Sequence, residues 1–572
     1  MEKLYLGISL GFNSSACVYS NERGLLAAIS QERLNGQKNT KEFPLEAALK
    51  CLEIVEVKEV DCLAISHYET ITTEYFAKHY KGEFQTTFIG EEIIFDLFRE
   101  KGISLNQIIR VDHHTAHGLS TFAFYPAPKN NNFTVITSDG FGDGFSGTIT
   151  NKEGKLSTVK LENSIGLVYQ FVTGALGFKE HQHEGKITGL AAYGKPIYLY
   201  EFENMYKRII TGNFLSFTTN EKLTPEEIQQ AKDSNIIDFD KYLLLKKSVY
   251  NLVADLIIDG ATREDIAATV QEFAEKHTLK WIEDYCIDGG DAYLAGGLFA
   301  NVKINQRIKD SGIFDNVYVS PPMGDEGTAV GAAIWVSLED GGHIIGGKLR
   351  NVRCGTEVDG DEETFDFLCN EINSRRLQDK YRVRFTRNNL DLIDYMTNQL
   401  KANKIVCLMK GRMEFGPRAL CNRSILYNAT KKETNDSLNA RLSRSEFMPF
   451  APVCRAEVAD DLFKNLDGGR DSARYMTMTF DGTDEFVNTY KAVAHIDGTA
   501  RPQIIDRKQD SFMWNLLKIY EDKTELKCLV NTSFNLHNNP IIESELVGLE
   551  SYLKADLDVL VIGNVIVEKI GE

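Results

Sequence analysis

The sequence lacks the marks of several protein classes. Its ten cysteines include no Cys-X-X-Cys pair, which argues against a zinc ribbon, an iron–sulfur cluster or a disulfide scaffold. It has no long apolar run and no N-terminal basic stretch followed by a hydrophobic one, so we expect a cytoplasmic protein without a membrane-spanning helix. Lysine and arginine number 64 against 82 aspartates and glutamates, a net charge of −18. That balance disfavours nucleic acid as a partner, because phosphate binding relies on cations.

Histidine, in contrast, is concentrated at one point of the chain, where His113, His114 and His117 fall within a few residues of one another. In a helix, His113 and His117 would share one face, and His114 would point elsewhere. Asp139 is the obvious third ligand, and Asp325, at a turn before a small-residue helix, is the fourth. This set predicts a divalent metal site. The alternative is a helix cap with a few partly buried histidines.

A strand–turn–strand plan occurs twice, in residues 4–24 and again in residues 133–154. The second turn carries Gly140 and Gly142, which allow close approach of the backbone to a ligand. Repeated units of this kind predict a duplicated nucleotide-binding α/β core in which two loops face one cleft. Backbone N–H groups in such loops can surround phosphates.

Two further segments are expected to line that cleft. Glu184 and Lys186 lie in a glycine-rich charged stretch, although an exposed charged loop is the alternative. Gly296 and Gly297 follow a strand and precede a helix that begins near Asn301. A helix start after a double glycine suits the ribose and phosphates of a nucleotide.

The acidic, glycine-rich segment between residues 339 and 363 predicts a boundary that divides the chain into domains of residues 1–350 and 351–572. In the second domain, arginines stand among glycine, proline and aromatic residues. Planar guanidinium groups bind phosphate oxygens in pairs and keep their charge when partly desolvated. The alternative is that each arginine anchors a loop through a salt bridge.

Together these motifs resemble, nearly from end to end, the ATP-dependent O-carbamoyltransferases, a family that includes the tobramycin, cephamycin and nodulation-factor carbamoyltransferases. The resemblance implies an N-terminal domain of the actin and hexokinase superfamily and a C-terminal α/β domain of the YrdC type that forms carbamoyl adenylate. It also implies that His113, His117, Asp139 and Asp325 hold a divalent metal in contact with nucleotide phosphates. Iron is the expected ion, although imidazole and carboxylate ligands suit manganese or zinc equally.

By the same resemblance, the C-terminal domain binds carbamoyl phosphate and ATP. The implied pocket residues are Lys410, Arg418, Arg423, Ser424, Arg444, Arg501, Asn531, Ser533 and Asn535. The expected reaction joins carbamoyl phosphate and ATP, with Mg²⁺, into carbamoyl adenylate, with Lys410 and Arg418 as catalytic cations. The carbamoyl group then passes to the N-terminal site, where an acceptor nucleophile attacks its carbon.

The acceptor is expected to be a small molecule or sugar, as in antibiotic or glycan biosynthesis, and the motifs do not identify it. The polar segment Thr218–Asp240 is a candidate for shaping acceptor choice. A homodimer is the ordinary expectation for the assembly.

One residue departs from the family pattern. Phe12 stands where the family usually has a histidine, the residue expected to deprotonate the acceptor. His114 is the first candidate to replace it, His181 and His183 are others, and the metal could itself lower the pKa of an acceptor hydroxyl. Cys421 stands where a glycine is usual.

Two other function classes remain open. A metal-dependent kinase or hydrolase of the actin and hexokinase superfamily would use the N-terminal motifs, but it leaves the arginine-rich C-terminal half unexplained. A carbamoyl-nucleotide-binding protein without turnover would fit the missing histidine.

Overall fold

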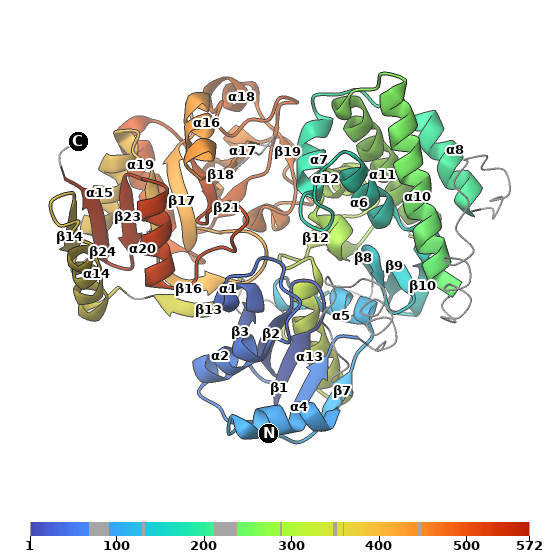
Figure 1. Cartoon of the computed structure of the whole chain (residues 1–572), viewed down its shortest axis with the longest axis horizontal. Coiled ribbons are helices and arrows are strands. Elements are labelled where there is room, and N and C mark those ends of the chain that lie inside the picture. Colours follow the sequence, from blue (N-terminus) through green and yellow to red (C-terminus); the bar gives the residue numbers. More distant parts are fainter. Residues whose placement is uncertain are drawn as a thin grey trace.

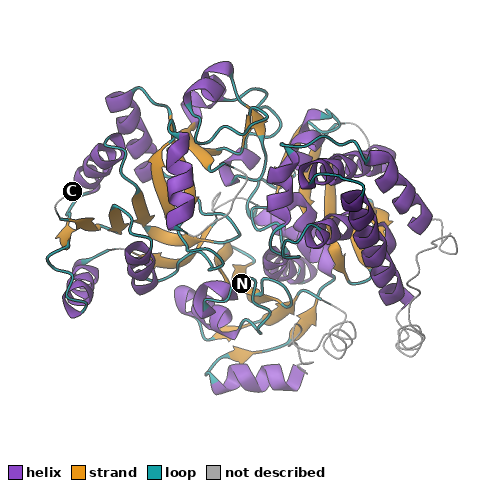
Figure 2. Cartoon of the chain, turned by 45° about the horizontal axis from the view of Figure 1, so that its top comes forward, coloured by secondary structure: helices purple, strands orange, loops and turns teal. Residues whose placement is uncertain are grey.

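The computed structural model describes residues 2–67, 91–128, 132–210, 237–286, 289–346, 352–358, 360–442 and 449–570. The N-terminal domain has two halves, drawn in blue and in teal to green, and the C-terminal domain, in orange to red, lies beside both (Figure 1). Helices cover the sheets of each part (Figure 2). Within the described residues, none of the helices has both the length and the apolar character needed to cross a bilayer.

The first half is a five-stranded sheet in which an antiparallel meander is extended by two parallel strands. Its order is β3-β2-β1-β5-β7, formed by Gly24–Ser30, Ser15–Ser20, Leu4–Ser9, Cys62–Ile65 and Ile108–Arg110. Helices α2 (Leu45–Val55) and α4 (Glu91–Glu100) contribute to the core on one face.

The second half repeats this topology. Its order is β10-β9-β8-β11-β12, formed by Gly154–Val159, Phe145–Asn151, Phe133–Gly142, Asp291–Ala295 and Asn316–Val319. The pairing is again antiparallel for the first three strands and parallel for the last two. Strand order and direction therefore confirm the duplicated α/β core. One face is covered by α6 (Ile165–Ala175), and α10 (Ile237–Ile258) and α11 (Arg263–Tyr285) pack on α6.

Two helices cross between the halves. Helix α13 (Thr328–Glu339) follows the second sheet in sequence but packs on β1, β2 and β5 of the first. Helix α5 (His113–Ser120) packs on β8 and β11 and directly against α13. A Cβ at Gly331 would lie 1.7 Å from the carbonyl oxygen of Ala116, so only glycine permits this approach. The crossing places α5 between the two sheets.

The C-terminal domain is built on an eight-stranded mixed sheet. Its order is β14-β24-β23-β15-β17-β22-β18-β21, formed by Tyr381–Phe385, Val565–Lys569, Val559–Ile562, Val406–Met409, Arg423–Asn428, Cys528–Ser533, Ala451–Arg455 and Gln503–Ile505. Helices α15 (Asn389–Lys401) and α19 (Ser511–Thr524) pack on one face. Helices α14 (Glu362–Ser374), α16 (Lys432–Arg441) and α20 (Glu545–Lys554) pack on the other.

A short antiparallel pair joins the two domains. Strand β13 (Arg353–Val358) pairs with β16 (Gly411–Glu414) and also contacts β3 of the first sheet. The domain boundary predicted at residue 350 lies outside the described residues. All ten cysteines are free thiols.

Candidate functional site

Helix α5 presents two histidines on one face because they lie four residues apart, and a cap fixes where the helix begins. The Asp112 carboxylate caps the helix by accepting hydrogen bonds from the Thr115 amide (2.8 Å) and hydroxyl (2.7 Å). His113 and His117 follow one turn apart, both fully buried. The helix places their rings between the end of β8, which carries Asp139, and the turn that begins at Asp325.

The four predicted ligands converge. The Nε2 atom of His117 lies 3.0 Å from Oδ2 of Asp139 and 3.4 Å from Oδ1 of Asp325. For Nε2 of His113 the corresponding distances are 3.6 and 3.8 Å. One ligand atom from each residue lies within 4.8 Å of all the others. The sequence prediction brought together residues from three separate segments, and the structure places them around one point.

The chemistry of this cluster fits a divalent cation. Nε2 of His113 is buried and has no hydrogen-bond partner among the described residues. Burial and the charge of Asp139 raise the pKa of Asp325, while the nearby His113 ring and the hydrogen bond from His117 outweigh burial and hold the pKa of Asp139 low. A cation would relieve the repulsion between the two carboxylates and would use the free nitrogen lone pair. Two imidazoles and two carboxylates suit iron, manganese or zinc.

His67 belongs to this neighbourhood although the sequence analysis missed it. Its ring stacks on that of His113 with centroids 4.6 Å apart, and its Nε2 lies 3.0 Å from the Leu10 carbonyl oxygen. The His113 amide in turn donates to Asp143 at 2.8 Å. An isolated histidine after a strand has no spacing signal, so only its place after β5, a parallel strand of the first sheet, could have indicated it.

The predicted glycines lie beside the metal cluster for specific steric reasons. A Cβ at Gly142 would lie 2.1 Å from the His113 ring, and one at Gly297 would lie 2.9 Å from Oδ1 of Asp139. Gly296 has a positive φ of 106° and passes close to the backbone of Ser138. Gly140 is less confined, with its nearest neighbour 3.4 Å from a built Cβ. These loops bring backbone close to the ligands, as a phosphate site would require.

Two residues predicted to bind the nucleotide lie on nearby helices. Asn301 caps α12 (Val302–Asp310), with its Oδ1 accepting from the amides of Lys303 and Ile304 and its Nδ2 donating to Gln271. The structure thus uses its amide for helix capping. Lys186 is buried on α7 (Glu184–Ala191).

The candidate bases have different environments. His114 is built into the core, with Nδ1 2.8 Å from the Thr137 hydroxyl and Nε2 3.0 Å from the Phe145 carbonyl oxygen. Burial lowers the pKa of His114 to about 3. His181 instead stacks on Phe12, with ring centroids 4.3 Å apart, and is exposed. Among the described residues, only one of its ring nitrogens has a hydrogen-bond partner, the Gln170 amide.

In the C-terminal domain, several predicted residues share one face of the sheet. Strands β17 and β22 pair Ser424 with Ser533 and Leu426 with Asn531, so these side chains project together. The Asn531 amide donates to Gln503 at 2.6 Å. Lys410 follows β15, and its ammonium group donates to Asn564 at 3.0 Å.

Other predicted residues lie apart from this face. Arg423 is fully buried toward the opposite face, where it donates to the carbonyl oxygens of Gly411 (3.0 Å) and Thr356 (3.2 Å). The Asn535 amide donates to two neighbouring carbonyl oxygens of its own turn. Strand alternation explains the position of Arg423, because it precedes Ser424 by one residue. Arg444 lies outside the described residues.

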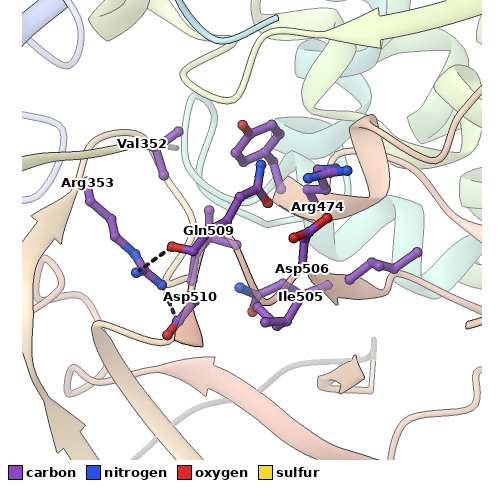
Figure 3. A pocket seen from close by; sticks show the side chains of 11 residues that line it. Val352, Arg353, Arg474, Ile505, Asp506, Gln509 and Asp510 are labelled. Atoms are coloured by element: carbon purple, nitrogen blue, oxygen red, sulfur yellow. Dashed lines mark hydrogen bonds and ion pairs between the residues drawn. The ribbon is translucent and has the colours of Figure 1, made fainter. Parts of the chain in front are cut away.

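A small hollow adjoins the Asn531 face through Gln503, which accepts a hydrogen bond from Asn531. Figure 3 shows side chains that line it. Gln503 lines it, and Arg353 forms an ion pair with Asp510 at its edge. Leu420, which precedes Cys421, is also in the wall. Arg353 and Gln503 were not among the predicted pocket residues, and their only sequence signal is a polar side chain at the first position of a strand.

Comparison with known proteins gives consistent matches in both domains. The family model described as carbamoyltransferase N-terminus matches residues 4–334, and that described as carbamoyltransferase C-terminus matches residues 397–569. An uncharacterized protein of Methanocaldococcus jannaschii is 30% identical over 99% of this chain and 100% of its own. Nodulation protein NolNO of Sinorhizobium fredii is 26% identical over 97% of this chain and 79% of its own.

Among solved structures, component A of the (R)-2-hydroxyglutaryl-CoA dehydratase of Acidaminococcus fermentans resembles this chain with a TM-score of 0.34 and 12% identity. The likeness covers 59% of this chain and 99% of that one. At this level it carries no argument about activity, and the family matches decide the assignment. Since one family model spans more than half of the sequence and a second spans most of the remainder, the chain belongs to the carbamoyltransferase family.

Proposed function

We propose that this protein makes carbamoyl adenylate from carbamoyl phosphate and ATP and transfers the carbamoyl group to a hydroxyl or amine of a small-molecule or sugar acceptor. The observation that carries the proposal is the presence, in one carbamoyltransferase chain, of two separate polar sites. One is the cluster of four possible metal ligands, and the other is the polar face around Asn531 with the loop of residues 415–422, which carries Arg418, beside it.

The C-terminal site is the proposed place of donor activation, in a domain of the YrdC type. Carbamoyl phosphate loses phosphate to water, and the resulting carbamate oxygen attacks the α-phosphorus of ATP, so that pyrophosphate leaves. Lys410, Arg418 and Arg501 supply cations that offset the negative charge of both substrates, with Mg²⁺ bound to ATP. Ser424, Asn531 and Ser533 supply hydroxyl and amide groups for hydrogen bonds to the carbamoyl group.

The N-terminal site is the proposed place of transfer. A divalent cation held by His113, His117, Asp139 and Asp325 would supply positive charge beside the nucleotide phosphate. The loops that carry Gly140 and Gly296 would place backbone amides around that phosphate. His181 is the histidine best placed to take the acceptor's proton, because His114 would first have to break a hydrogen bond within the core.

The test is a reaction of the purified protein with ATP, carbamoyl phosphate and Mg²⁺, in which pyrophosphate and phosphate are measured separately. We expect both products only when both substrates are present, and we expect Arg418→Ala to abolish them. Arg382→Ala, an exposed arginine on β14, is the matched control and should retain activity.

Other products would contradict the proposal. ADP in place of pyrophosphate would favour a kinase or hydrolase, and tight nucleotide binding without any turnover would favour a binding protein. The acceptor can then be sought with radiolabelled carbamoyl phosphate and candidate sugars or amines.

A further inference from the structure

The loop that carries Arg418 is mostly embedded in the protein. Residues 415–422 connect β16 to β17, and all of them are buried except Pro417 and Arg418. The loop therefore has a projecting tip and two fixed arms. The contacts that hold each arm are known from the structure.

The returning arm is held by a single carboxylate. Glu414, the last residue of β16, is 2% exposed, and its Oε1 accepts three backbone amides. The donors are Leu420 (2.6 Å), Asn422 (2.7 Å) and Arg423 (3.2 Å). Successive N–H groups that converge on an anion form a nest, and hydrogen bonds to a charged oxygen are stronger than those to a neutral one.

The outgoing arm is held by the other domain. Arg33, on α1 (Gln31–Asn35), has a side chain that is 3% exposed, and its Nη2 donates to the Gly416 carbonyl oxygen at 2.8 Å. Gly416 has a φ of 113°, and a Cβ there would lie 3.2 Å from the Pro321 carbonyl oxygen. This arm is thus confined between α1 and the segment that leads to Asp325.

A further observation concerns the second oxygen of Glu414. Oε2 is buried and has no hydrogen-bond partner among the described residues. Burying a carboxylate with one oxygen unsatisfied is unfavourable, so a neutral residue would be expected if the position only filled space. The three amide hydrogen bonds explain why a charged residue stands at position 414, because a carboxylate oxygen that accepts them fixes the shape of the loop.

We propose that Glu414 and Arg33 are positioning residues, which hold the 415–422 loop so that the Arg418 guanidinium meets the phosphate of the donor. Neither residue touches substrate on this account. The inference rests on the proposed function, since it assigns the loop to donor activation. It follows from the sensitivity of such reactions to geometry, where a displacement of 1 Å can cost about 100-fold in rate.

The experiment measures pyrophosphate release by the full-length protein with ATP, carbamoyl phosphate and Mg²⁺, and determines kcat and KM for Glu414→Ala, Glu414→Gln and Arg33→Gln. Glutamine keeps one carbonyl oxygen as an acceptor, so it should partly restore what alanine loses. We expect kcat/KM to fall about 10- to 100-fold in Glu414→Ala and roughly 3- to 10-fold in the other two variants. Glu371→Ala and Arg23→Gln, both in surface ion pairs, should stay within about two-fold of wild type.

Hydrogen–deuterium exchange of peptides that cover residues 415–423 gives a second readout independent of turnover. The amides of this segment should exchange faster in Glu414→Ala than in wild type, with Glu414→Gln between them. If Glu414→Ala fails to fold, Glu414→Gln and Arg33→Gln decide the question.

Two outcomes would overturn the inference in distinguishable ways. If the wild-type protein releases pyrophosphate and the folded variants do so with unchanged kcat and KM, Glu414 and Arg33 support only stability. If the wild-type protein releases none, the proposed function fails first, and the assignment of the loop to donor activation fails with it.

Discussion

His117 is the residue on which the candidate metal site depends most, since its Nε2 lies nearest to both carboxylates. Its replacement by alanine removes one ligand. It also removes the imidazole that lies beside both carboxylates, so less offsets the repulsion between Asp139 and Asp325. We expect His117→Ala to lose metal affinity by more than the roughly 10- to 100-fold typical of residues that only support a ligand. Metal content after dialysis, measured by mass spectrometry, checks this, and the exposed His343→Ala is the control. Unchanged metal content would show that the ion binds elsewhere.

Glu184 should make stability depend on pH. Burial raises the pKa of its carboxyl to about 7 from a usual 4.5, so the folded protein keeps the proton where the unfolded chain loses it. The neutral form thus contributes its full stability below about pH 4.5, and that contribution is lost as pH rises to about 7. We expect Glu184→Gln to be more stable than wild type at pH 8, by about 1–3 kcal/mol, and much closer to it at pH 5. Urea unfolding at both pH values tests this, and an equal difference at both would contradict it.

Single residues also show where sequence reasoning reaches its limit. Spacing within a helix predicts that His113 and His117 converge, because helical geometry is local. It does not show that position 142 must be glycine to make room for the His113 ring, nor that the buried Arg423 donates to the Thr356 carbonyl oxygen. Those facts depend on neighbours distant in sequence. Arg353, the first residue of β13 and without a motif around it, was missed for the same reason.

At the scale of elements, the contact between α5 and α13 is the least tolerant of change. Because a Cβ at Gly331 would collide with the Ala116 carbonyl, Gly331→Ala must push the two helices apart. We expect a loss of about 1–3 kcal/mol or more in the free energy of unfolding and weaker metal binding, since α5 carries two ligands. Thermal denaturation and metal titration measure the two effects.

The matched control for this variant is Gly185→Ala. A Cβ at Gly185, in the first turn of α7, would meet nothing within 4 Å. It should leave stability unchanged or slightly raised. If Gly331→Ala behaved like Gly185→Ala, the helices would have to be free to separate without cost.

The repeated strand–turn–strand units were predictable from sequence because each is a local meander closed by a hairpin. Strand order and direction confirm the duplication. The packing of α13 on the first sheet was not predictable, because no local pattern in residues 328–339 indicates which sheet they cover. The eight-stranded sheet of the second domain was likewise beyond local patterns, since β14 and β24 pair across most of that domain.

For the whole molecule, hydrogen bonds and ion pairs connect the two domains at several points. Lys303 pairs with Asp497 at 2.7 Å, and the Asn305 amide donates to the Thr477 carbonyl oxygen at 2.7 Å. The Asn305 contact is buried, and a buried polar contact of this kind couples the stabilities of the parts it joins. We therefore expect one cooperative unfolding transition by scanning calorimetry, and two well-separated transitions would contradict it. Lys303→Ala weakens the connection between the domains, so its single calorimetric transition should broaden toward two. Lys280→Ala, which breaks an ion pair within one helix, should leave the transition single.

The crossing of α13 has a consequence for synthesis on the ribosome. The first sheet is complete in sequence at Arg110, but the helix that covers its inner face begins only at Thr328. At about 5–20 residues per second, that face waits on the order of 10–40 s for its cover. During this interval a growing chain presents an apolar sheet surface, including Tyr5 and Tyr19, to solvent or to a chaperone. Early arrest of translation should therefore yield aggregation-prone fragments, and completed chains should fold late and as a unit.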